Sequence, residues 1–174
     1  QEALPRWRRL LEGMRHSEIR DAEAIHHHYD VSNTFYEYVL GPSMTYTCAV
    51  FPTEDATLEE AQETKYDLVA RKLDLQEGQR LLDLGCGWGG MVRHAAREYG
   101  VNVIGVTLSR EQASWAQRRI KEEGLDHLAE VRFMDYRHVE ESGFDAISSI
   151  GLTEHIGLKN YASYFSWIRD HVKP

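Results

Sequence analysis

The sequence predicts an α/β protein with a doubly wound, mostly parallel sheet and a helical segment in front of it. Apolar segments of strand length alternate with amphipathic helical segments from residue 58 onward, and a glycine-rich turn follows the first of these strands. Before residue 58, short helical patterns and aromatic-rich loops replace this alternation. We therefore expect an N-terminal helical segment at 1–57 and an α/β core at 58–174.

The core elements follow from the spacing of the apolar residues. A helix is predicted over 58–75, because its apolar residues and Lys65 recur at helical intervals before Gly78. Strands are predicted at 80–86, 101–108, 129–135 and 144–152, and helices at 91–100, 110–125 and 159–173. Helical crossovers of this length join parallel strands. No strand follows the last predicted helix, so we expect an incomplete sheet and a chain that is truncated relative to a longer protein.

The composition excludes one class of partner and indicates a compartment. The 174 residues are 42% apolar and carry a net charge of −8, which argues against nucleic acid because phosphate binding needs a basic face. Cys48 and Cys86 are far apart, and the first residues do not resemble a signal peptide, so we expect a cytoplasmic protein. No apolar run approaches the ~20 residues of a membrane span, which leaves peripheral contact as the way to meet lipid.

The first 20 residues are basic, with five arginines against three glutamates. Leu4, Trp7, Leu11 and Met14 share one helical stripe, and two interpretations stay open. The stripe contacts the anionic inner face of a membrane, or it packs on its own domain or on a partner subunit. The adjacent histidines at 26–28 cannot share one helix face as a metal-binding pair does, so we expect no metal site.

The glycine-rich turn LLDLGCGWGG suits a cationic cofactor better than a dinucleotide. Gly85, Gly87 and Gly90 satisfy the G-x-G-x-x-G spacing between a strand and a helix. Asp83 precedes the turn, and two unit charges ~5 Å apart repel by about 3 kcal/mol near a protein surface. Thr107 stands where a dinucleotide site places an acidic residue for the ribose. S-adenosylmethionine carries a sulfonium and no phosphate, so we favour it and place a nicotinamide dehydrogenase last.

Two further positions fall at the crevice that such a sheet forms. Gln112 lies at the head of a helix, and Asp135 and Tyr136 follow the third strand. Tyr136 would lie against the adenine, and Asp135 would accept from its amino group. A solvated helix residue and an ordinary loop pair account for the same positions equally well.

Three stretches together resemble the cyclopropane-fatty-acid synthase family of S-adenosylmethionine-dependent methyltransferases. They are HHYDVSNTFYEYVLGPSMTYTCAVF, LLDLGCGWGG with VIGVTLS, and SIGLTEHIG with LKNYASYF. The resemblance implies a Rossmann-like class I methyltransferase fold. It implies cofactor contacts from Tyr46, Thr47, Gly85, Gly87, Thr107, Leu108, Gln112, Asp135 and Tyr136. It also implies a lid formed by His28, Tyr29, Asp30, Asn33, Phe35 and Tyr36, for which an aromatic cluster anchoring the N-terminal helices is the alternative.

The resemblance implies two catalytic positions, Glu154 and Cys48, which would hold a bicarbonate ion beside the reacting carbons. Glu154 is expected at the inner end of a buried strand, where its carboxylate accepts from the hydroxyl of bicarbonate. His155 is expected to point away from it. We do not expect a thiolate nucleophile at Cys48, because TYTCAVF contains no basic residue. We expect Cys48 to pack against the ion or the core instead.

The reaction that the resemblance implies is methyl transfer to the cis double bond of an unsaturated phospholipid acyl chain. The product is a cyclopropane or a methylene-branched chain, with bicarbonate as the base. A histidine and a tyrosine beyond Pro174 would complete the site, and a homo-oligomer or a partner reductase is a further expectation. A methyltransferase of a small soluble metabolite and a non-catalytic, cofactor-binding regulatory subunit are the alternatives.

Overall fold

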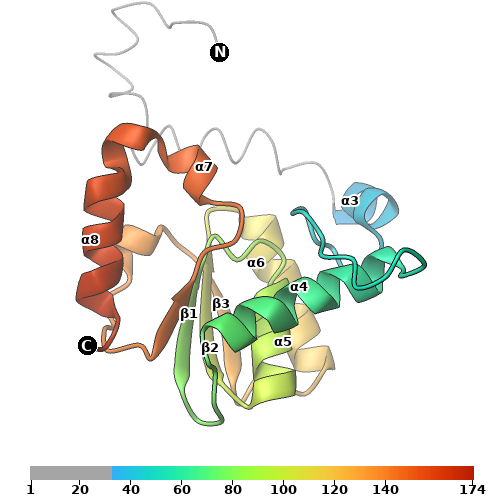
Figure 1. Ribbon diagram of the computed structural model, residues 1–174, viewed down its shortest axis with the longest axis horizontal. Helices are drawn as coiled ribbons and strands as arrows, with labels where there is room; N and C mark the ends of the chain where they lie inside the picture. Colours follow the sequence, from blue (N-terminus) through green and yellow to red (C-terminus); the bar gives the residue numbers. More distant parts are fainter. Residues whose placement is uncertain (1–32) are drawn as a thin grey trace, which may run out of the picture.

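The computed structural model describes residues 33–174 and confirms the predicted fold class. Its four strands all pair in parallel, in the order β3-β2-β1-β4, with helices between them (Figure 1). The elements are α3 (Asn33–Leu40), α4 (Leu58–Lys72), β1 (Arg80–Leu84), α5 (Gly90–Tyr99), β2 (Asn102–Thr107), α6 (Arg110–Glu122), β3 (Ala129–Phe133), β4 (Ala146–Ser148), α7 (Thr153–Ile156) and α8 (Tyr161–His171), with short 3-10 turns at Tyr136–His138 and Leu158–Asn160. Since β1 has β2 on one side and β4 on the other, the direction of the strand order reverses between β1 and β4, where parallel sheets bind their ligands.

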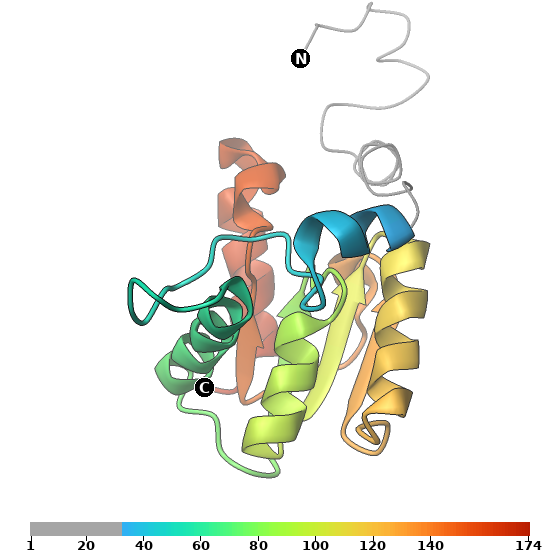
Figure 2. The same cartoon turned by 90° about the vertical axis from the view of Figure 1, so that its right-hand side faces the viewer.

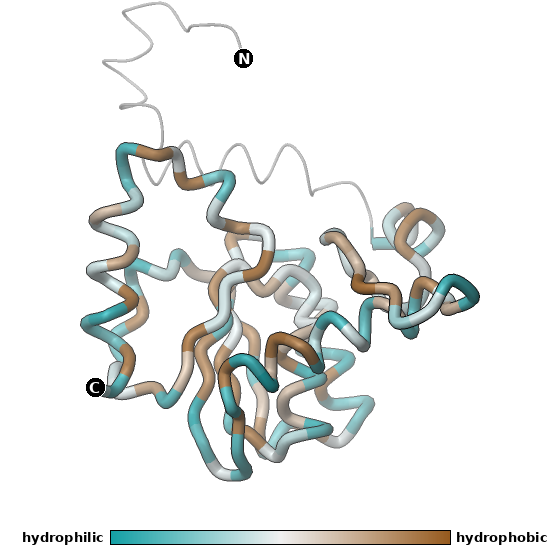
Figure 3. Tube along the Cα trace, viewed as in Figure 1, coloured by the Kyte–Doolittle hydropathy of each residue, from teal (hydrophilic) through white to brown (hydrophobic). Residues whose placement is uncertain are grey.

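Helices cover both faces of the sheet, as the prediction of a doubly wound core requires. Helices α4, α5 and α6 lie on one face and α8 lies on the other (Figure 2). Along β1, Leu81 packs into the core under α4, α5 and α6, whereas Leu82 and Leu84 pack into the core under α8. The strands are therefore largely apolar along their length, while the loop before β1 is hydrophilic (Figure 3).

A third, smaller core holds the segment before α4 against the sheet. Tyr36 and Met44 pack there with Trp88 from the glycine-rich turn and Trp115 from α6. Helix α3 thus lies across the ends of α5 and α6 (Figure 2). The boundary between segments at residue 57 stays a prediction; Thr57 itself caps α4, and its hydroxyl and amide exchange hydrogen bonds with Glu60.

The prediction of a strand over 144–152 was wrong beyond residue 148. Strand β4 ends at Ser148, and Gly151 then takes a φ of 77°, which turns the chain into helix α7. The last helix was predicted to have no strand after it, and the structure shows a single bridge there. After α8, Val172 forms a parallel bridge with Phe144, so the chain returns beside the start of β4.

Residues 33–174 contain neither a membrane-spanning helix nor a metal-binding cluster. No helix there is long and apolar enough to cross a bilayer. The described residues also contain no group of three or more His, Cys, Asp or Glu side chains placed to hold a metal ion, and the histidines at 26–28 lie outside them.

Candidate active site

The glycine-rich turn leaves β1 at the edge of the sheet where β4 also ends (Figure 1). Gly85 and Gly87 have φ angles of 69° and 55°, which favour glycine. A Cβ at Gly90 would lie 2.1 Å from the Tyr66 hydroxyl, and one at Gly85 would lie 3.2 Å from Leu152. At Gly87, by contrast, nothing lies within 4 Å of that position. Gly85 and Gly90 therefore allow close packing at this turn, while the space beside Gly87 is open.

Asp83 is a buried carboxylate just before this turn. It is 2% exposed, and its Oδ1 accepts a hydrogen bond of 2.6 Å from the Ser148 hydroxyl on β4. Burial raises the pKa of Asp83 to about 7, although the Ser148 hydrogen bond and the charge of Lys65 act to lower it. A positive charge bound nearby would stabilise the ionised form. The residues of this edge therefore fit a cationic ligand and disfavour a pyrophosphate.

Thr107 and Gln112 form a pair at the end of β2. The buried Thr107 hydroxyl donates to Gln112 Oε1 over 2.7 Å and accepts from the Ser109 amide over 3.2 Å. Ser109 caps α6, since its hydroxyl accepts from the Gln112 amide. Thr107 thus orients the Gln112 side chain at the head of α6, and Leu108 lies half-buried between them. The ribose contact of Thr107 stays a prediction.

Asp135 and Tyr136 follow β3 but already have protein partners. The Asp135 carboxylate accepts from the Arg137 amide, Nε and Nη2 over 2.9, 2.8 and 2.5 Å. Burial acts to raise the pKa of Asp135, but the hydrogen bonds and charge of Arg137 outweigh it and hold that pKa below its usual range. The Tyr136 ring packs edge-on against Tyr164 and Trp167 of α8. That Arg137 binds the Asp135 carboxylate was not predicted from the sequence.

The segment with Tyr46, Thr47 and Cys48 is held against α4. Lys65 donates from Nζ to the Thr47 hydroxyl over 2.6 Å, and Gln62 donates from Nε2 to the Thr47 carbonyl over 2.9 Å. The Tyr46 ring is 60% exposed and meets Tyr36 edge-on. Cys48 is exposed, so the alternative that it packs against the core was wrong, while packing against the ion stays a prediction.

The prediction that no basic residue lies beside Cys48 holds for its own segment but not in space. Helix α4 brings Lys65 to this segment, where its Nζ donates to the hydroxyl of Thr47, the residue before Cys48. The sequence did contain a signal, because a lysine on the apolar stripe of a predicted helix is a buried cation that needs partners.

Glu154 does not stand at the inner end of a buried strand, and that prediction was wrong. It lies exposed in the first turn of α7, because Gly151 ends the extended chain before it, and His155 is exposed as well. The turn still meets the segment of Cys48. A Cβ at Gly151 would lie 2.6 Å from Thr47 Cγ2 and 3.8 Å from Glu154 Oε1. The structure therefore gathers Thr47, Gly151 and Glu154 at one place.

Helix α3 covers the turn through Trp88. The Trp88 indole donates to Asn33 Oδ1 over 2.9 Å, and its ring lies 4.8 Å from that of Tyr36. The Trp115 indole donates to Glu37 over 3.1 Å. Of the predicted lid, His28, Tyr29 and Asp30 lie outside the described residues, as does the stripe of Leu4, Trp7, Leu11 and Met14.

Comparison with known proteins adds relatives that share both sequence and fold. A Mycobacterium tuberculosis protein named as a probable fatty acid methyltransferase is 66% identical over 173 residues, which are 99% of this chain and 40% of that protein. The cyclopropane-fatty-acyl-phospholipid synthase of Escherichia coli K12 is 44% identical over 147 residues, which are 84% of this chain and 37% of the synthase. This chain thus spans about two fifths of the length of both relatives.

The crystal structure of a mycolic acid cyclopropane synthase, CmaA1, in complex with SAH and CTAB matches with a TM-score of 0.83. It is 39% identical, and the match covers 87% of this chain and 53% of that one. A family model described as mycolic acid cyclopropane synthetase matches residues 16–174, nearly the whole chain. With its parallel sheet, its glycine-rich turn and these relatives, the chain belongs to the cyclopropane synthase family of S-adenosylmethionine-dependent methyltransferases.

Proposed function

We propose that this chain forms the cofactor-binding part of an enzyme that methylates the cis double bond of an unsaturated phospholipid acyl chain. The product is a cyclopropane or a methylene-branched fatty acid. One observation carries the proposal: a buried carboxylate, Asp83, precedes the open turn at Gly87, at the edge of the sheet where Thr47 and Glu154 both lie near Gly151. The names of the relatives, which include a probable fatty acid methyltransferase and a cyclopropane-fatty-acyl-phospholipid synthase, support the substrate class.

S-adenosylmethionine would supply an electrophilic methyl group at this edge. Its holders would be Asp83, Gly85, Gly87, Thr107, Leu108, Gln112, Asp135, Tyr136, Tyr46 and Thr47. Asp83 provides negative charge for the cationic groups of the ligand, and Gly87 lets the backbone approach it. SAH bound to the related CmaA1 supports this choice of cofactor.

We place the proton acceptor at Glu154 and the segment of Cys48. A double bond is a weak nucleophile, so the chain must orient it and exclude water from the cation that follows. Glu154 would accept a hydrogen bond from the hydroxyl of a bicarbonate ion, and the ion would take the proton that leaves the substrate. The short approach between Gly151, Thr47 and Glu154 supports this assignment.

An acyl chain drawn from a bilayer needs an apolar environment, since ~10 methylenes at ~0.8 kcal/mol each forfeit about 8 kcal/mol in water. The segment around α3 exposes large apolar side chains, among them Phe35, Tyr38, Val39, Val50 and Phe51.

We propose that the protein acts peripherally at the inner face of the membrane, with residues 1–15 as the contact. Flotation of the full-length protein with anionic liposomes, with and without residues 1–15, tests this; equal binding removes the proposal.

Product analysis tests the reaction. The full-length protein, incubated with S-adenosylmethionine and a mono-unsaturated phospholipid, is expected to yield ring protons or vinylidene protons in the NMR spectrum of the released fatty acids. Cofactor binding without any modified lipid would favour the regulatory subunit instead. Methylation of a soluble metabolite alone would favour the small-molecule enzyme.

A pair of glycine variants tests the cofactor site. Gly87→Ala and Gly124→Ala both place alanine at a positive φ, 55° and 70°, where nothing lies within 4 Å. Each is expected to cost about 1 kcal/mol of stability from left-handed backbone. Calorimetry should show a loss of S-adenosylmethionine affinity for Gly87→Ala alone. Equal affinity in the two variants would contradict the assignment of Gly87.

A further inference from the structure

Lys65 is a buried cation that the proposed reaction leaves without a role. It is 6% exposed in the middle of α4. Its Nζ donates to the Thr47 hydroxyl over 2.6 Å and to Gln62 Oε1 over 2.7 Å, and it lies 4.4 Å from the centre of the Tyr66 ring. Because a charged group is costly to bury, this placement needs compensation by opposite charge.

The compensating charge comes from Asp83. Burial lowers the pKa of Lys65 to about 8, while the charge of Asp83 acts to raise it. The same coupling acts on Asp83, whose pKa the charge of Lys65 lowers against the effect of burial. Lys65 is therefore electrostatically coupled to the carboxylate at the carboxyl end of β1 and is hydrogen-bonded to Thr47, the residue before Cys48.

We propose that Lys65 is a positioning residue of the cofactor site, which fixes Thr47 beside the turn after β4 and supplies the positive charge that offsets the buried Asp83 carboxylate. The proposal rests on the proposed function, because it assumes that Asp83 serves S-adenosylmethionine. An apolar side chain at this position would leave the Thr47 hydroxyl and Gln62 Oε1 without their donor. It would also leave Asp83 without its nearby cation.

The position of Thr47 matters because the space around it is tight. Gln62 holds the Thr47 carbonyl, and Lys65 holds its hydroxyl, so α4 fixes both sides of this residue. The Thr47 methyl group lies against Gly151, next to the Glu154 carboxylate. A shift of Thr47 would therefore reach the turn that carries Glu154.

The groups that face this pair come from several elements. Among the described residues, the other titratable groups that are electrostatically coupled to Lys65 or Asp83 are Cys48, Tyr66, Cys86 and Tyr164. Burial raises the pKa of Tyr66 to about 12 and raises the pKa of Cys86 and Tyr164 as well, so these three stay neutral near pH 7. The ionisation of Asp83 at that pH is therefore favoured by the Ser148 hydrogen bond and by the charge of Lys65.

The first test measures S-adenosylmethionine affinity by calorimetry on the full-length protein between pH 5.5 and 8. Lys65→Met is expected to lose about tenfold in affinity at pH 7 and to move the acid limb of the profile to higher pH, since each pKa unit corresponds to a factor of ten. Thr47→Val removes the hydroxyl but keeps the charge, so its acid limb should match that of the wild type. Lys65→Arg should restore the limb.

A second measurement does not depend on the folding of a Lys65 variant. The midpoint of Lys65 is followed by NMR of its ¹⁵N-labelled side chain in the wild type and in Asp83→Asn. Loss of the Asp83 charge is expected to lower this midpoint. An unchanged midpoint, or a Lys65→Met variant with the wild-type pH profile, would overturn the role of Lys65 alone. A wild-type protein that does not bind S-adenosylmethionine at all would instead overturn the proposed function.

Discussion

Asp83 and Lys65 show how burial changes the pKa of ordinary side chains. Each would be fully charged in water, and each is shifted toward neutrality by the removal of solvent. Their mutual attraction opposes this shift. The pair therefore keeps charge in the interior at a cost in stability, which is typical of positions selected for binding.

The pH dependence of stability should reveal this cost. The folded-state pKa of Asp83 is raised from 3.8 to about 7, so the folded state binds a proton that the unfolded state releases, and stability falls as pH rises through this window. Asp83→Asn removes that term. The Tm of the variant relative to the wild type is expected to rise between pH 4 and pH 7 and then to level off. A constant difference across this range would show that Asp83 has an ordinary pKa.

The short elements at the carboxyl edge of the sheet depend on glycine. Between β4 and α7, Gly151 has a φ of 77°, and its lack of a side chain lets the turn approach Thr47. A longer β4 would carry Glu154 away from the segment of Cys48, since a strand rises about 3.3 Å per residue. The interruption of the strand therefore keeps Glu154 near Thr47, the residue before Cys48.

Gly151→Ala tests this turn. The new methyl group would meet Thr47 Cγ2 at 2.6 Å in a left-handed backbone, so we expect a loss of about 2–4 kcal/mol, the sum of overpacking and backbone strain. Gly143→Ala is the matched control, because Gly143 has a φ of 69° and nothing within 4 Å of the new Cβ. Its loss should be about 1 kcal/mol, from strain alone. Thermal unfolding of both variants provides the measurement, and equal losses would contradict the close approach.

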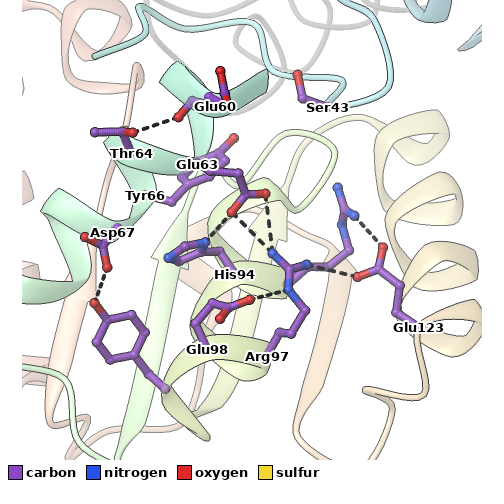
Figure 4. A network of polar contacts seen from close by, with 12 residues as sticks. Ser43, Glu60, Glu63, Thr64, Tyr66, Asp67, His94, Arg97, Glu98 and Glu123 are labelled. Carbon is purple, nitrogen blue, oxygen red and sulfur yellow. Dashed lines mark hydrogen bonds and ion pairs between the residues drawn. The ribbon is translucent and has the colours of Figure 1, made fainter. Parts of the chain in front are cut away.

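At the scale of the whole molecule, ion pairs tie together the helices on one face of the sheet. Figure 4 shows Glu63 of α4 facing His94 and Arg97 of α5, with Glu123 at the end of α6 beside the same arginine. Arg93 donates to Glu123 over 2.6 Å, and its side chain is only 11% exposed. The hydrogen bond from His94 is the main cause that lowers the pKa of Glu63. This network fixes the spacing of three helices behind the glycine-rich turn.

Glu123→Ala should destabilise the protein by about 1–3 kcal/mol, because it leaves the buried Arg93 without its carboxylate. Glu98→Ala is the control, since Glu98 pairs with Arg97 at the surface and such pairs contribute less than about 1 kcal/mol. Urea unfolding of the two variants gives both values. Similar losses of unfolding free energy in the two variants would mean that the burial of an ion pair does not affect its contribution to stability.

Local sequence patterns were enough to predict the fold class, the order of the strands and helices in the core, and the place of the glycine-rich turn. These features depend on local periodicity and on the residue types of one turn, which neighbouring residues specify. The family also follows from sequence stretches, and the comparisons confirm it.

The position of Glu154, the hydrogen-bond partners of Asp135 and Thr107, and the contact of Lys65 with Thr47 became known only from the folded chain. The position of Glu154 depends on the left-handed conformation of Gly151, which ends the extended chain earlier than the sequence pattern predicts. The spacing of apolar residues gives no information about that conformation. Asp135 is bonded to Arg137, two residues further on, but a local pair of this kind is one among several that the sequence allows. Lys65 and Thr47 are 18 residues apart, and their contact exists because α4 and the preceding segment pack on the same edge of the sheet. Burial and contacts between residues far apart in the sequence determine the pKa values of Lys65 and Asp83. Neither burial nor such contacts can be read from the residue type alone.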